Sequence, residues 1–296
     1  MLTVHRSNRA EALADALADL LARRPGDATS ADVLHEEWVV VPSPGMERWL
    51  AMRIARKAGI CADVRFPFPA ALIQAALASV AGPDAESVRA WRDAWSGRRV
   101  AWRVVGAVQA RVASDPRYAS LRAYLGDGAG PGAPVDARAW GMLKRIAATF
   151  DDYLTYRQEM LRNWDAGVLE PNEAGDWQPD LWSAVCAATP VPHPAKVAQA
   201  FFDALRDGVP SPVAIPPRVC LFGVSTLPPF YLQVVQGLAR FRDLDLFTLD
   251  PCRFWWGDVQ TPGEKALRRR KEPHARFEDL HLEDGNPLLA SMGLLG

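Results

Sequence analysis

The sequence lacks the glycine-rich phosphate loop of nucleotide hydrolases, although it has the strand, turn and helix in which such a loop occurs. Residues 38–41 (Trp-Val-Val-Val) are apolar, a tight turn at 42–45 follows, and an amphipathic pattern continues to about Lys57. A phosphate loop needs several glycine amides around the phosphates and a lysine that neutralises them. This turn has one glycine, two prolines without an amide hydrogen, and no lysine before Lys57. We therefore expect a nucleotide-hydrolase frame without the catalytic residues.

The sequence is also poor in cysteine, lysine and net charge. Its cysteines are far apart and form no C-x-x-C pair, which is typical of reduced thiols in the core of a cytoplasmic protein. They are Cys61, Cys186, Cys220 and Cys252. The formal net charge of -1 excludes a global basic field, so any contact with nucleic acid has to come from a local groove. Only five of the 34 basic residues are lysine; arginine suits phosphate better, but a GC-rich genome produces the same bias.

Long apolar runs are absent as well. No run approaches the ~18–20 residues of a membrane span, and the first residues show no signal-peptide pattern. We therefore expect a cytoplasmic protein without a membrane segment. With 296 residues, 49% of them hydrophobic, the chain is long enough for one large or two ordinary domains with a sizeable core.

The order of the apolar patterns predicts an α/β fold. A short strand at 2–5 precedes a helix whose apolar residues recur at helical spacing from Leu13 to Leu21, and Asn8 and Glu11 are placed as its capping box. The strand at 38–41 is apolar on both faces, as a central parallel strand is. Helical patterns follow at 46–57, 70–80, 86–113, 137–156 and 197–205. Strands at 218–224 and 244–249, around a helix at 228–240, complete the pattern.

These patterns predict three parts. Residues 1–65 and 211–260 form two halves of one parallel-sheet domain, and residues 66–210 form a helical insertion with a mobile glycine- and proline-rich loop at 126–134. Residues 261–296 form a basic and acidic loop and the start of a helix. Because the chain stops within this apolar helix, we expect it to be a fragment of a longer protein.

The turn at 42–45 has two interpretations. The free amides of a helix N-terminus attract an anion by about 0.3–1 kcal/mol. Alternatively, Pro44 and Gly45 only turn the chain between strand and helix. A second turn at 223–229 has the same form and also lacks lysine, which weakens the hypothesis of a nucleotide enzyme.

Residues 150–157 (Phe-Asp-Asp-Tyr-Leu-Thr-Tyr-Arg) are the densest polar and aromatic cluster. Neighbouring helical residues point about 100° apart, so Asp151 and Asp152 would not bind one metal ion together. Either this is an exposed helix face with Phe150 in the core, or Arg157 and a tyrosine line a nucleic-acid channel. The basic run 268–271 is interpreted as a solvated loop. The histidines are scattered and no G-x-S-x-G occurs, so no catalytic residues and no metal site are predicted.

Several of these segments together resemble RecC, the gamma subunit of bacterial exodeoxyribonuclease V (the RecBCD helicase-nuclease). The matching stretches occur in family order and cover nearly the whole chain. They are 5–8 (His-Arg-Ser-Asn), 43–46 (Ser-Pro-Gly-Met) with Trp49-Leu50, Gly59-Ile60, 66–69 (Phe-Pro-Phe-Pro), 150–157, 222–232 (Phe-Gly-Val-Ser-Thr-Leu-Pro-Pro-Phe-Tyr-Leu), 251–258 (Pro-Cys-Arg-Phe-Trp-Trp-Gly-Asp) and 286–291 (Asn-Pro-Leu-Leu-Ala-Ser).

The resemblance implies a superfamily-1 helicase-like domain, inactivated by the loss of its Walker A residues, with a large helical insertion. It implies a non-catalytic subunit that scaffolds RecB-like and RecD-like subunits in a heterotrimer for DNA repair by recombination. Such a subunit binds DNA ends, guides single-stranded DNA and scans for the signal Chi. No cofactor is expected on this chain; ATP and Mg belong to the partner subunits. The family's later helicase-like and nuclease-like domains would be absent.

The resemblance also implies which positions face the DNA strand. They are Pro42, Pro44, Arg48, Phe68, Gln74, Asp151 and Arg157. Since Pro42 and Pro44 have no group that can hydrogen-bond to a base edge, the resemblance implies strand binding but not a particular Chi sequence. Two other functions are considered: a divergent nucleotide hydrolase that uses the 42–45 turn, and an α/β module that binds only proteins.

Overall fold

The structure, a computed structural model, describes residues 1–23, 36–82, 84–126, 130–170, 176–208 and 215–250, together with Ala266 and Arg270. The chain forms two compact units. The sheet unit consists of Met1–Leu72, Pro216–Leu227 and Leu238–Gly296, and the helical unit consists of Ile73–Ile215 and Pro228–Gly237. The predicted helix after Asn286 and all of the basic run 268–271 except Arg270 lie outside the described residues.

The sheet unit contains five parallel strands in the order β1-β5-β4-β2-β3. They are β1 (Leu2–Ser7), β2 (Glu37–Val40), β3 (Val64–Arg65), β4 (Arg218–Phe222) and β5 (Asp243–Leu249). The register places Val219 of β4 opposite Trp38 on one side and Leu244 on the other. A parallel α/β sheet is thus confirmed, and the short β3 was not predicted.

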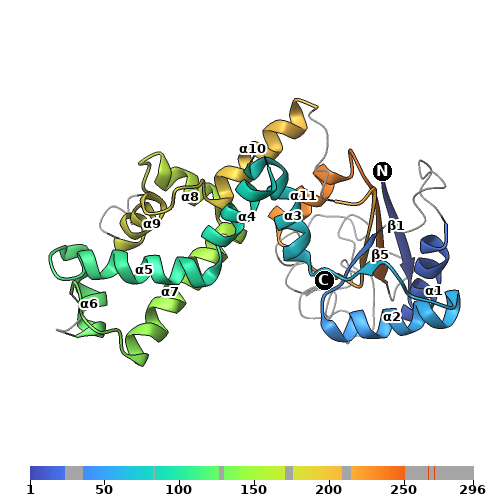
Figure 1. Ribbon diagram of the computed structural model, residues 1–296, viewed down its shortest axis with the longest axis horizontal. Coiled ribbons are helices and arrows are strands. Elements are labelled where there is room, and N and C mark those ends of the chain that lie inside the picture. Colours follow the sequence, from blue (N-terminus) through green and yellow to red (C-terminus); the bar gives the residue numbers. More distant parts are fainter. Residues whose placement is uncertain are drawn as a thin grey trace. The chain divides into compact units, whose positions relative to one another are not determined.

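Two helices, α1 (Ala10–Leu21) and α2 (Pro44–Ala58), pack beside this sheet (Figure 1). Alternate residues of the strands reach them because strand side chains alternate between faces. One buried cluster joins apolar residues of α1 and α2 to side chains on or directly after the strands, namely Val39, Val41, Cys220, Phe222 and Phe247. The predicted capping box of α1 is wrong, because the helix begins after Arg9, which makes no side-chain cap bond.

The sequence of α2 explains both of its ends. Ser43 is extended and its Oγ accepts a hydrogen bond from the Met46 amide, and Pro44 follows at the first helical position, where its missing amide hydrogen costs nothing. Gly59 ends the helix with a φ of 83°, in the left-handed region that glycine adopts without strain.

Replacing Gly59 by alanine is expected to lower the free energy of unfolding by about 1–2 kcal/mol, since alanine is strained at this φ. Gly45→Ala, at the other end of the same helix, is the matched control. Its new Cβ would lie 3.8 Å from Ser43 Oγ, an ordinary contact, and it is expected to stabilise by up to about 1 kcal/mol. Urea denaturation of both variants measures their free energies of unfolding. If the two substitutions changed this free energy equally, the assignment of Gly59 as the end of the helix would be contradicted.

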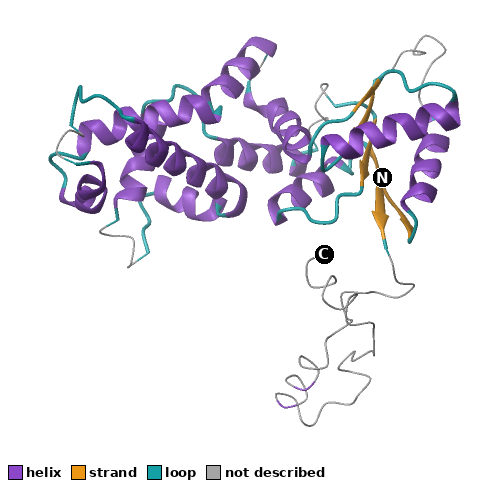
Figure 2. Cartoon of the chain, turned by 90° about the horizontal axis from the view of Figure 1, so that it is seen from below, coloured by secondary structure: helices purple, strands orange, loops and turns teal. Residues whose placement is uncertain are grey.

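The helical unit consists of helices joined by loops (Figure 2), and a buried core cluster joins its helices α5 to α9. Its helices are α3 (Pro69–Ala81), whose first residues belong to the sheet unit, α4 (Ala85–Ala94), α5 (Gly97–Arg111), α6 (Ala119–Leu125), α7 (Ala137–Tyr156), α8 (Gln158–Asp165), α9 (Trp177–Ala187), α10 (Pro194–Arg206) and α11 (Pro229–Leu238), with a short 3-10 turn at Pro116–Tyr118. Phe150 of α7 and Trp182 of α9 are among its most buried side chains, with ring centroids 5.4 Å apart.

The single helix predicted at 86–113 is wrong, because α4 and α5 are separate. Ser96 is extended between them, and its hydroxyl bonds the Asp93 carbonyl at 2.8 Å. A serine that competes for backbone carbonyls, followed by Gly97, favours a break over a continuous helix.

In the structure the boundaries between the two units lie after Leu72 and before Pro216, whereas the sequence patterns predict boundaries at residues 66 and 211. The larger difference concerns α11, which was expected within the sheet domain 211–260. Residues 228–237 belong to the helical unit instead, and the Phe230 ring lies 6.4 Å from the Phe202 ring of α10. Among the described residues, no helix is both long and apolar enough to cross a membrane.

Candidate nucleic-acid interface

The turn after β2 lies at the carboxyl edge of the sheet, where open α/β sheets bind their ligands. Val41 is buried, while Pro42 and Pro44 are exposed. The turn after β4 is its neighbour, because a Cβ on Gly223 would lie 3.4 Å from the Met46 side chain at the start of α2. The two turns that the sequence singled out therefore meet at one edge of the sheet.

The N-terminus of α2 has few free donors for an anion. Pro44 has no amide hydrogen, the Met46 amide donates to Ser43 Oγ at 3.3 Å, and the Glu47 amide donates to the Ser43 carbonyl at 3.1 Å. Of these first four positions, only Gly45 has an amide without an acceptor among the described residues. A phosphate cradle needs several convergent amides, so the geometry favours a plain turn over an anion site.

Arg48 is exposed one turn into α2 and makes no ion pair within the described ranges. The other cations of the helix differ, because Arg53 is paired with Asp15 at 2.8 Å and Lys57 with Asp19 at 2.6 Å. The Arg53 guanidinium bonds Asp15 and lowers the pKa of that carboxyl. Arg48 is therefore available for an external anion.

Sequence reasoning missed that Arg48 belongs to a longer exposed stripe on α2. Met52 is 50% exposed, and Arg56 is exposed and makes no ion pair in the described part of the chain. The spacing of four residues was the available signal, since residues four apart share a helix face. Arg48 and Arg56 are about 12 Å apart along the helix axis, at 1.5 Å per residue.

The segment 66–69 runs beside the turn, because the Val41 amide donates to the Pro67 carbonyl at 3.1 Å. Phe66 packs against the core, whereas Phe68 is 43% exposed and its carbonyl accepts bonds from the first amides of α3. Pro42, Pro44, Arg48 and Phe68 are here called the turn surface. Gln74 is also exposed, but it lies on α3 within the helical unit.

Asp151 and Arg157 lie at the end of α7 in the helical unit and are here called the helix-end surface. Both are exposed, and Arg157 occupies the break between α7 and α8 with φ −135° and ψ 42°. Its guanidinium makes no ion pair with any described residue. Phe150 is buried, so this segment combines a core face with exposed polar residues.

The electrostatics of the helix-end surface are set by its carboxyl groups. Although Asp151 is exposed, neighbouring groups desolvate its carboxyl and raise its pKa above the ordinary value, and the Asp152 carboxylate adds to the rise. Tyr231 of α11 is close enough for the Asp151 charge to act on it, and desolvation raises the pKa of that phenol. Asp151 therefore accepts a proton more readily than an ordinary surface aspartate.

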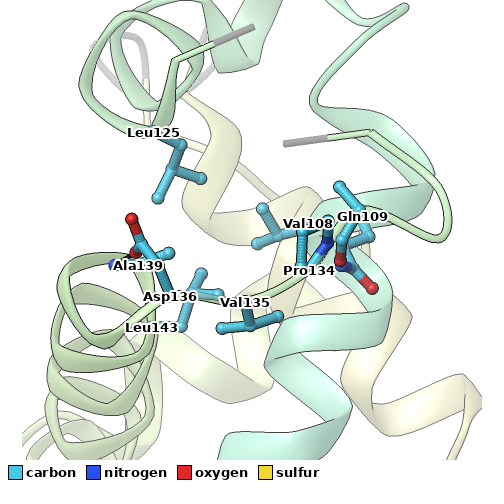
Figure 3. A pocket seen from close by; sticks show the side chains of 9 residues that line it. Val108, Gln109, Leu125, Pro134, Val135, Asp136, Ala139 and Leu143 are labelled. Carbon is cyan, nitrogen blue, oxygen red and sulfur yellow. Dashed lines mark hydrogen bonds between the residues drawn. The ribbon is translucent and has the colours of Figure 1, made fainter. Parts of the chain in front are cut away.

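A cavity of about 220 Å³ in the helical unit does not provide a catalytic site (Figure 3). Its lining comes from α5, α6, the start of α7 and the segment before it, and is mostly apolar. The side chain of Gln109 donates to the Ala133 carbonyl at 2.8 Å, and Asp136 caps α7 by accepting from the Ala139 amide at 2.7 Å. The polar side chains that line the cavity are thus engaged in local structure.

Comparison with known proteins agrees with these observations. The sequence profile of the family described as "RecC, N-terminal domain" matches residues 2–296. The chain is 32% identical to the "RecBCD enzyme subunit RecC" of Escherichia coli (strain K12) over 323 residues, which is 100% of this chain and 27% of that protein. It is also 32% identical to the subunit of the same name from Mycolicibacterium smegmatis, over 99% of this chain and 24% of that protein. In Haemophilus influenzae the corresponding values are 26% identity, 100% and 30%.

The match extends over both units and over the turns and helix ends described above. The chain spans only about a quarter of the length of its relatives from E. coli and M. smegmatis. A family profile that matches nearly every residue nevertheless determines the relationship, and the chain belongs to the RecC family through the N-terminal domain of that family.

Proposed function

We propose that this chain is the DNA-guiding part of a non-catalytic RecC-type subunit. In this proposal it adopts a superfamily-1 helicase-like fold without a functional Walker A motif, binds single-stranded DNA, and assembles with RecB-like and RecD-like subunits at a DNA end. ATP and Mg are then bound by the partners. Scanning for a Chi-type signal and a cytoplasmic location belong to the same proposal.

The observation that carries this proposal is a contrast at the turn surface between few free amides for a phosphate and exposed side chains suited to a DNA strand. The helix N-terminus has few free amides for a phosphate, whereas Arg48 and Phe68 are exposed beside it. A guanidinium that binds backbone phosphate and an aromatic ring that stacks on a base are the two groups with which proteins hold single strands. The same contrast disfavours the divergent nucleotide hydrolase.

The helix-end surface supports the proposal from the helical unit. Arg157 is exposed, and Asp151 has a raised pKa. A carboxyl group that becomes neutral easily is compatible with a polyanion nearby, because protonation removes the repulsion. A module that binds only proteins gives no reason for free arginines on both surfaces.

Arg48→Gln is expected to weaken single-strand binding about five-fold at 0.1 M salt and to reduce the slope of log K against log salt by about 0.7, since one phosphate contact is lost. Fluorescence anisotropy with a labelled mixed-sequence strand measures both quantities. Lys57→Gln on the same helix is the matched control, because Asp19 already neutralises Lys57. The proposal would be contradicted by two results together: the chain binds Mg-ATP and Gly45→Asp abolishes this binding, and Arg48→Gln leaves single-strand binding unchanged.

Single-strand binding is also expected to strengthen as the pH falls below neutrality. The raised pKa means that Asp151 becomes neutral at a higher pH than an ordinary aspartate, and its negative charge beside the strand is then lost. Asp151→Asn should bind about two- to five-fold more tightly at pH 7 and lose this part of the pH dependence.

Asp152→Asn provides the control for this pH dependence. The Asp152 charge contributes to the raised pKa of Asp151, so its removal should move the pH dependence toward lower pH without abolishing it. An anisotropy titration across this pH range distinguishes the two variants. A pH profile that neither substitution changes would remove Asp151 from the interface.

A further inference from the structure

Away from both surfaces, three potential metal ligands meet inside the helical unit. They are Asp165, Cys186 and His193, and one ligand atom from each lies within 4.8 Å of the other two. The cluster lies where α8, α9 and α10 come together (Figure 1). Neither the strand-binding proposal nor the core packing uses this combination of groups.

Each ligand stands at or near the end of a helix. Asp165 is the last residue of α8, Cys186 is in the last turn of α9, and His193 is the residue immediately before α10. The carboxyl ends of helices carry a partial negative charge that favours a nearby cation. Two such ends, α8 and α9, supply two of the three ligands.

His193 is held rigidly in this position. It is 2% exposed, its Nε2 lies 2.5 Å from Asp165 Oδ2, and the rings of Trp95 and Trp182 contact it edge-on at centroid distances of 6.0 and 5.2 Å. The Asp165 side chain is itself only 14% exposed. Burial therefore fixes His193, whereas Cys186 is only partly buried and Asp165 is an exposed residue whose side chain is turned toward His193.

The second ring nitrogen of His193 has no assigned role in the protein. Nδ1 is buried and has no hydrogen-bond partner among the described residues. A buried polar atom without a partner costs about 1–3 kcal/mol and calls for an explanation. The His193 ring therefore has a hydrogen-bonding capacity that the described residues leave unused.

A catalytic cysteine with a histidine base explains the cluster less well. Cys186 is partly buried in the last turn of α9, where the partial negative charge of the helix end disfavours a free thiolate nucleophile. A bound cation changes this situation, because a thiol that coordinates a metal loses its proton.

We propose that Asp165, Cys186 and His193 bind a zinc ion, with water as the fourth ligand. A thiolate, an imidazole and a carboxylate are the donors that Zn²⁺ prefers. The charges also balance, since one thiolate and one carboxylate neutralise a divalent ion around a neutral imidazole. The ion would tie together the ends of three helices and so act structurally.

The required movement is small. Two ligands on a tetrahedral zinc ion, each about 2.0–2.1 Å from it, are about 3.3 Å apart. His193 Nε2 and Asp165 Oδ2 would have to separate by about 0.8 Å from their present hydrogen bond, while the Cys186 sulfur already lies within 4.8 Å of the other two ligand atoms. Lys196 Nζ lies 3.5 Å from Asp165 Oδ2, but its side chain is 58% exposed and can move into solvent.

The test measures metal content directly. The full chain is stripped with chelator, reloaded with zinc chloride, passed through a desalting column and analysed by plasma mass spectrometry. We expect about one zinc per chain, a near-complete loss in Cys186→Ala, and full retention in the matched control Cys61→Ala, which is a partly buried free cysteine of the sheet unit. Cobalt loading should give a thiolate charge-transfer band in the wild type and not in Cys186→Ala.

A stability measurement covers the case in which Cys186→Ala affects folding. The wild type should show a melting temperature that rises with zinc concentration, because the ion binds only the folded state, whereas Cys186→Ala should melt at one temperature with or without zinc. A wild-type chain that retains no zinc, or a Cys186→Ala chain that retains as much as the wild type, would overturn the proposal and leave the cluster as a polar link between helices.

Discussion

Arg218→Met is expected to lower the free energy of unfolding of the sheet unit by about 3–5 kcal/mol, because it removes the guanidinium that pairs with the buried Glu37 carboxylate. Arg218 is 5% exposed and Glu37 is 8% exposed. The guanidinium donates to both carboxylate oxygens of Glu37, with Nε 3.2 Å from Oε2 and Nη2 in contact with Oε1. Its Nη1 donates to the carbonyls of Leu20 and Arg23 at 3.0 Å.

This arginine therefore joins β4, β2 and the end of α1. Its loss breaks one buried ion pair and removes a side-chain donor from the carbonyls of Leu20 and Arg23, of which the Leu20 carbonyl keeps the Arg23 amide as a donor, so a large effect is expected. Urea denaturation of the variant should show a lower midpoint. The double variant Arg218→Met with Glu37→Leu is the informative control, because removing both charges should recover most of the stability. If the double variant is no more stable than Arg218→Met, the ion pair is not the cause.

Phe150→Ala is expected to destabilise the helical unit by about 3–5 kcal/mol. The ring is 1% exposed and contacts Trp182 and Tyr153, with centroids 5.4 and 6.2 Å away. Its removal leaves a cavity among large rings that relax poorly. Thermal or urea unfolding followed by tryptophan fluorescence measures the loss, since Trp182 reports on this core directly.

Asp152→Ala is the matched control for Phe150→Ala. Asp152 is exposed on the same helix, and its substitution is expected to change the stability by no more than about 0.5 kcal/mol. Phe150→Ala should reduce strand binding only in proportion to unfolding. A loss of binding under conditions where the variant is fully folded would assign the ring to the interface rather than to the core.

The sequence predicted the elements with strong periodic patterns. The helix 137–156 and the strands at 38–41, 218–224 and 244–249 all appear close to their expected bounds, because long amphipathic or continuously apolar segments have few alternatives. The two-residue β3 has too short a pattern to be recognised. The break at Ser96 depends on one serine and one glycine within an otherwise helical pattern, which periodicity does not detect.

The candidate sites show a similar division. Arg48 and Phe68 were named through the family resemblance, and both are exposed in the structure beside the same turn. The cluster of Asp165, Cys186 and His193 was missed, because the predicted absence of a metal site relied on short ligand spacings. These residues are distant in sequence and come together only through the packing of three helices.

The strand order has a consequence for how the chain reaches its fold. β2 pairs with β4, and β1 pairs with β5. Two of the four strand pairings therefore join a strand that precedes the main helical segment in the sequence with a strand that follows it. During synthesis the helices α3 to α10 emerge before Arg218, when β1 and β2 have no such partners, and only α11 of the helical unit follows β4. Helices rich in local contacts form quickly, whereas distant parallel pairing is slow. The helical unit is therefore expected to fold first. Once folded, it reduces the length of flexible chain between β1 or β2 and their partners β5 and β4, which lowers the entropy cost of pairing these strands. Mutations in the core of the helical unit should therefore also slow the formation of the sheet.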